Sequence, residues 1–163
     1  MKTEKLRDWL EIVGMFMVVL SLAFVGFEIR QAHKISLSQA YQSRTATAAE
    51  WNYELAANPA ALSGFRKANE GRDDEITPEE YAAVFRMVAS VLFLYDNAHY
   101  QYQQGFVSAE FWGTTRTSLK SFMAPSAIKT MVMARLEVQG RPEFKAVIRA
   151  IDDELRAEAN NSE

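Results

Sequence analysis

Residues 12–27 read IVGMFMVVLSLAFVGF, a run of sixteen residues without a single charge. At 1.5 Å per residue this run forms about 24 Å of helix, and Trp9, Leu10 and Ile29 extend the apolar band to roughly 31 Å. The hydrocarbon core of a bilayer is about 30 Å thick, so the band is long enough to cross it. Trp9 has the amphipathic ring that suits the membrane–water interface.

Two other interpretations of this segment compete with a membrane span. A signal peptide has a basic start and a small-residue cleavage site, which Ser21-Leu22-Ala23 resembles, but Glu4, Asp8 and Glu11 are untypical of such a start. A core helix would need more surrounding protein than the chain offers, because apolar residues cover every side. We therefore predict one transmembrane helix, in contact with the lipid bilayer through Trp9, Ile12, Phe16, Leu20, Phe24 and Phe27.

The orientation of this helix does not follow from its flanks. The positive-inside rule counts basic residues near both ends of a span. The two counts here are equal, with Lys2, Lys5 and Arg7 before the span and Arg30, Lys34 and Arg44 after it.

The composition excludes several classes of function. The 163 residues include no cysteine, only two histidines and a formal charge of −3. Disulfides, thiolate catalysis and zinc–cysteine sites are therefore excluded, and no overall positive field attracts nucleic acid. Neither G-x-S-x-G nor a glycine-rich phosphate loop occurs, so we expect no catalytic residues and no cofactor. Seven glycines and four prolines predict long helices, and no strand pattern appears, so we expect an all-α fold.

The helix is expected to continue well beyond the span, because residues 28–57 contain neither glycine nor proline. Small side chains at helical spacing allow two helices to approach closely. Such side chains recur along one side of this helix, so we predict association there; the alternative is a solvated stalk. The residues concerned are Gly14, Ser21, Ala32, Ser36, Ala40 and Ser43.

The remaining chain predicts a small helical bundle. Thr77, Pro78 and Glu80 form a typical helix start with a capping box, and residues 81–95 are apolar enough for a central helix buried nearly all round. The other expected helices cover residues 59–69, 108–124, 125–139 and 142–157, and Gly105 and Gly140 are expected at helix ends. The predicted organisation is a tail and transmembrane helix (1–30), a stalk (31–57), a bundle (58–157) and a frayed tail (158–163).

Two segments, FEIRQAHKISLSQAYQ (27–42) and LYDNAHYQYQQGFVSAEFW (94–112), resemble a widespread bacterial family of small, uncharacterised single-pass membrane proteins. Residues 29–33 match its I-R-Q-N-T type segment except at Ala32-His33. Residues 96–105 match its E-N-x-x-Y-x-Y-x-x-G type segment, with Asp96 in place of Glu. The resemblance implies a membrane anchor in the bacterial inner membrane and a cytoplasmic soluble domain, and it implies no reaction.

Asp96 and His99 are the candidate metal ligands. Carboxylate-x-x-His is half of a di-iron site in helical bundles, but His33 has Arg30 three residues before it and supplies no second copy. We therefore favour a hydrogen-bonded polar cluster of Asp96, Asn97 and His99 over a metal site.

Two further features leave alternatives open. Arg86 lies within the most apolar helix, where it is either paired with an acidic group or part of an exposed stripe with Ser90. An aromatic group surrounds Gly105 and belongs to either a core or an interface. Its members are Tyr95, Tyr100, Tyr102, Phe106, Phe111 and Trp112.

The favoured hypothesis is a non-enzymatic, membrane-anchored helical protein that acts by association. It would be a homo-oligomer or an accessory subunit, with itself or another membrane protein as partner. One alternative is an oligomeric pore, although Ser21 is the only polar residue other than glycine in the span, which makes a wetted wall hard to build. The other alternative is a metal-binding protein that uses Asp96 and His99.

Overall fold

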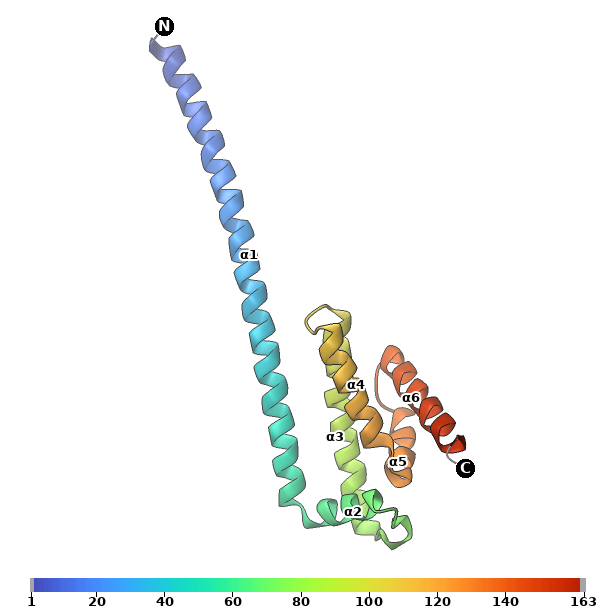
Figure 1. The fold of residues 1–163 in the computed structure, drawn as a ribbon. Helices are drawn as coiled ribbons and strands as arrows, with labels where there is room; N and C mark the ends of the chain where they lie inside the picture. Colours follow the sequence, from blue (N-terminus) through green and yellow to red (C-terminus); the bar gives the residue numbers. More distant parts are fainter. Residues whose placement is uncertain (1, 162–163) are drawn as a thin grey trace. The chain divides into compact units, whose positions relative to one another are not determined.

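The computed structural model describes residues 2–161, with side chains from residue 7 onward, and this part of the chain is all-α. It contains no strand, which confirms the predicted fold class. Figure 1 shows the helices in chain order: α1 (Lys2–Ala57), α2 (Pro59–Asn69), the short 3-10 helix η1 (Asp73–Glu75), α3 (Pro78–Gln103), α4 (Ala109–Met123), α5 (Ser126–Leu136) and α6 (Pro142–Asn160).

The chain divides into two units, Met1–Tyr41 and Gln42–Glu163. The first unit is a single stretch of helix from α1. No proline precedes Pro59, so the helical hydrogen bonds of α1 continue unbroken to Ala57.

The second unit contains the last turns of α1 and the bundle of α2–α6. α3 is its central element, because α2, α4 and α5 all pack against it. The hydrophobic core includes Ala61 and Ala68 of α2, Val84, Val88 and Leu92 of α3, Leu119 and Met123 of α4, Ile128, Met131 and Val132 of α5, and Phe144, Ile148 and Ile151 of α6.

α3 and α4 start at the capping residues that the sequence predicts. The Thr77 hydroxyl accepts from the backbone N–H of Glu80, and a Glu80 carboxylate oxygen accepts from the N–H of Thr77 at 2.8 Å. Ser108 caps α4 by accepting from the N–H of Phe111 at 3.2 Å. α3 ends at Gln103, and Gly105 follows with a φ of 76°, the left-handed conformation that glycine adopts at low cost.

Two expected helix ends are wrong. α5 ends at Leu136 rather than Gln139. Gln139 instead turns inward, where its amide donates to the backbone oxygen of Ala89 in α3 at 2.9 Å. α6 continues to Asn160, so the expected tail from residue 158 is helical at least that far, and residues 162 and 163 lie outside the described part.

α3 is not buried nearly all round, contrary to the prediction. Phe93 is 60% exposed. It lies on the same side of the helix as the exposed residues Ala82, Arg86, Ser90 and Asn97. The apolar run therefore has one face in the core and one face exposed to solvent.

Candidate functional site

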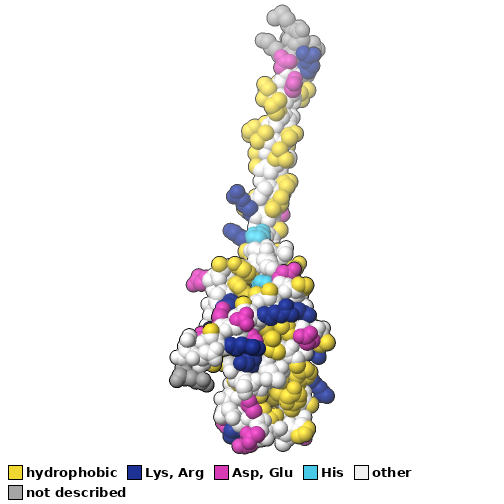
Figure 2. Space-filling view, turned by 90° about the vertical axis from the view of Figure 1, so that its right-hand side faces the viewer, with side chains coloured by type: hydrophobic (Ala, Val, Ile, Leu, Met, Phe, Trp, Pro, Cys, Tyr) yellow, Lys and Arg dark blue, Asp and Glu magenta, His cyan; other side chains and the backbone are white. Residues whose placement is uncertain are grey.

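The apolar part of α1 is unburied. One helix of the described chain is long and apolar enough to span a membrane, and none of its most apolar eighteen-residue window is buried. The six anchor residues are 49–65% exposed, and Figure 2 shows hydrophobic side chains along this stretch of α1. In water such a surface would be costly at roughly 25 cal/mol per Å². By its length and composition the segment could therefore span a membrane.

Two of the serine hydroxyls on the small-residue side of α1 form hydrogen bonds within the helix. Ser21 donates to the backbone oxygen of Met17 at 2.8 Å, and Ser36 donates to that of Ala32 at 3.0 Å. Ala40 is half-buried, whereas Gly14, Ala32 and Ser43 are exposed like the two serines. At 100° per residue all six predicted association residues lie on one side of a regular helix.

Asp96 and His99 have different partners, so the predicted polar cluster is wrong. Asp96 Oδ1 accepts from Arg141 Nε at 2.9 Å, and its Oδ2 accepts from the Arg141 backbone N–H at 3.3 Å. This pair fixes the start of α6 against α3. Asn97 is exposed, and its side-chain oxygen accepts from Gln101.

His99 is buried between aromatic rings. Its ring centroid lies 4.8 Å from that of Trp112 and 6.1 Å from that of Phe144. Burial, reinforced by the charge of Arg141, lowers the pKa of the imidazole, while Asp96 and Glu143 raise it less. Its Nδ1 is buried without a hydrogen-bond partner in the described chain. The neutral ring therefore packs as an aromatic group.

No third metal ligand joins Asp96 and His99. Between residues 7 and 161 no group of three or more His, Cys, Asp or Glu side chains could hold a metal ion. The two candidate ligands are engaged by Arg141 and Trp112 respectively.

The aromatic group around Gly105 divides between core and surface. Trp112 is buried and stacks on Tyr102 at 5.8 Å. Tyr95 is partly buried against the core. The other four rings are exposed at least in part, and basic side chains cover two of them: Arg141 lies over Tyr100 at 4.9 Å and Arg44 over Phe111 at 5.0 Å.

A buried ionic network between α2 and α3 was not predicted. Glu80 accepts from Lys67 Nζ at 2.7 Å and from the Ser63 hydroxyl at 2.6 Å. These hydrogen bonds, with that of Thr77, lower the pKa of Glu80 to about 2. The sequence identifies Glu80 through its capping box, but nothing local indicates Lys67 or Ser63 as its partners.

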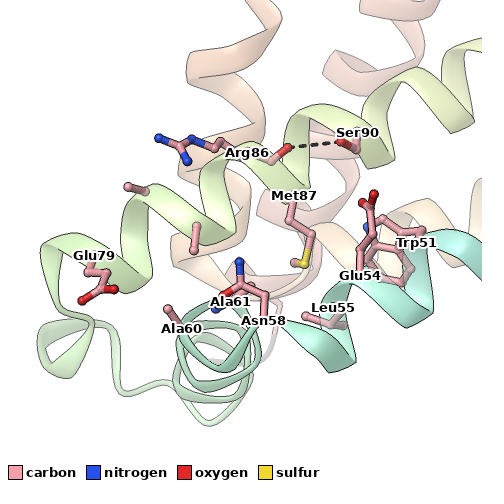
Figure 3. A pocket seen from close by; sticks show the side chains of 12 residues that line it. Trp51, Glu54, Leu55, Asn58, Ala60, Ala61, Glu79, Arg86, Met87 and Ser90 are labelled. Atoms are coloured by element: carbon pink, nitrogen blue, oxygen red, sulfur yellow. Dashed lines mark hydrogen bonds between the residues drawn. The ribbon is translucent and has the colours of Figure 1, made fainter.

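Arg86 is exposed, as is Ser90 one turn later, which agrees with the alternative of an exposed stripe rather than a paired, buried arginine. It forms no ion pair with any described residue. Instead it lines a cavity of about 370 Å³ between the end of α1, α2 and α3. Figure 3 shows Met87 projecting from α3 toward Leu55 and the turn at Asn58.

Comparison of the chain with known protein families, with characterised proteins and with solved structures found no match.

Proposed function

We propose that this protein is a non-enzymatic, single-pass membrane protein that acts by association, as a homo-oligomer or as an accessory subunit of a membrane complex. The bundle lies on the cytoplasmic side of a bacterial inner membrane, as the family resemblance implies. No reaction is part of the proposal.

The observation that carries the proposal is the unburied apolar stretch of α1. The bundle completes its own core from α2–α6 without this stretch. A helix that is apolar on all sides and is not buried by other protein is typical of a segment surrounded by lipid. The face of small residues on the same helix supports contact with other helices.

Membrane integration is tested by replacing Val18 and Val19 with lysine. Each lysine costs roughly 3 kcal/mol at the centre of a bilayer on the insertion scale. We expect the wild type to stay in membranes during carbonate washing and the double variant to be released. The control is Ala46→Lys together with Ala49→Lys, two exposed positions beyond the apolar stretch. Release of the wild type by carbonate would contradict the anchor.

A further inference from the structure

Two cavities lie along the seam between the last turns of α1 and α3. One measures about 370 Å³ and the other about 230 Å³, and both are lined by Trp51, Glu54 and Ser90. We call them together the α1–α3 groove. It extends along α3 from Glu79 to Leu94, roughly 22 Å at 1.5 Å per residue. That length matches about four turns of a helix.

The lining of the groove is partly apolar. Leu55 of α1 and Ala83 and Met87 of α3 line it, and Leu94 closes one end. Empty space beside such side chains forfeits the dispersion contacts that a close-packed interior supplies. An apolar occupant would restore these contacts.

The rim of the groove is acidic and unneutralised. It carries Glu50, Glu54 and Glu79 against the single cation Arg86, a formal charge of −2. Within the described part of the chain none of these four side chains forms an ion pair. The groove therefore complements an occupant that is apolar on one side and basic at its edges.

A second copy of this chain is a poor occupant. Glu50 and Glu54 continue the helical side on which Ser36, Ala40 and Ser43 lie, at alternating spacings of three and four residues. In a parallel pair of copies these glutamates would face each other, and like charges at such positions repel. A basic helix from a different protein would pair with them instead.

We propose that the α1–α3 groove binds an amphipathic helix of a partner protein that carries lysine or arginine beside its apolar face. This inference rests on the proposed function and specifies the partner of the accessory-subunit form.

The test measures peptide binding to the full chain in mild detergent by fluorescence anisotropy. The probe is a labelled amphipathic peptide of about 16 residues built from leucine, alanine and lysine, long enough for roughly 24 Å of helix. Its twin has glutamate at every lysine position. We expect the lysine peptide to bind and the glutamate twin to bind at least about tenfold more weakly.

Two groove variants and one control locate the site. Glu50→Gln with Glu54→Gln removes rim charge, and Ser90→Trp fills the groove from an exposed position. Each should weaken binding of the lysine peptide by about tenfold. Glu110→Gln with Glu137→Gln makes the same charge change at exposed sites outside the groove and should leave binding unchanged.

No binding of the lysine peptide, equal binding of its twin, or an equal loss in the control variant would each overturn the groove assignment. Carbonate washing of the Glu50→Gln, Glu54→Gln variant separates this result from the proposed function. The variant should stay in membranes, because the anchor does not involve the groove. Failure of the anchor would appear as release of the wild type, whatever the peptide result.

Discussion

At the scale of single residues, Gly64 sets how closely α2 approaches α3. A Cβ atom at this position would lie 2.8 Å from Val84 Cγ2, 3.0 Å from Glu80 Cβ and 3.2 Å from the Glu80 backbone oxygen. The backbone oxygen belongs to the capped first turn of α3 and cannot move without disturbing the Lys67–Glu80 pair. The small residue is therefore required by contact between helices and not by backbone conformation.

We expect Gly64→Ala to destabilise the bundle. Overpacking costs about 1–3 kcal/mol, which exceeds the helix-propensity gain of up to about 1 kcal/mol. Gly113→Ala is the matched control, because no atom lies within 4 Å of its added Cβ, and it should raise the melting temperature. If Gly64→Ala also raised the melting temperature, the close crossing of α2 and α3 would be contradicted.

His99 makes stability depend on pH. Its folded pKa is lowered below the ordinary value of 6.5, so the unfolded chain binds the proton more readily. The neutral ring contributes fully to the free energy of unfolding above pH 6.5. This contribution is lost as the pH falls through and below that value. Glu80 behaves likewise at lower pH: its stabilisation is present above about 4.5 and is lost as the pH falls toward 2.

His99→Phe isolates the histidine effect. Phenylalanine keeps an aromatic ring against Trp112 and Phe144 but does not titrate. Between about pH 7.5 and about pH 5 the melting temperature of the variant should fall less than that of the wild type. Identical slopes for the two proteins over this range would show that His99 is not held neutral.

At the scale of elements, α3 has a buried face and an open face that its sequence does not distinguish. Leu92 is 2% exposed and Phe93 is 60% exposed, although they are neighbours in the same apolar run. Leu92→Ala should therefore cost about 2–5 kcal/mol of unfolding free energy, and Phe93→Ala should change it by no more than about 0.5 kcal/mol. Urea denaturation of both variants measures the difference. Equal losses would mean that Phe93 is covered in the folded protein.

The starts of helices could be predicted because capping is local chemistry. Thr77 with Glu80, and Ser108, act on backbone groups within three residues of themselves. The end of α5 could not be predicted, because it depends on the bond from Gln139 to Ala89, fifty residues away. For the same reason the sequence suggests His99 rather than Arg141 as the partner of Asp96. The spacing of three residues on one helix can be read from the sequence, whereas a partner on another helix cannot.

At the scale of the whole molecule, the association proposal rests on the small-residue side of α1. Helices in a membrane gain little from hydrophobic burial against each other, so close packing of small side chains must stabilise their contact. The contact would extend from Gly14 to Ser43 and stop before Glu50, where two copies would repel. The hydroxyls of Ser21 and Ser36 are satisfied within the helix, so packing against them leaves no polar group unpaired.

Replacing Ser36 and Ala40 by leucine should force such helices apart. We expect an oligomeric wild type in mild detergent and a smaller mass for the double variant, measured by native mass spectrometry or light scattering. Gln31→Leu with Ser38→Leu is the control, because it adds bulk at exposed positions on the opposite side of α1 and should leave the mass unchanged. Equal dissociation by both pairs would mean that bulk anywhere on α1 disrupts assembly. A monomeric wild type would exclude self-association and leave only the accessory subunit, for which a partner helix in the α1–α3 groove is then the contact to seek.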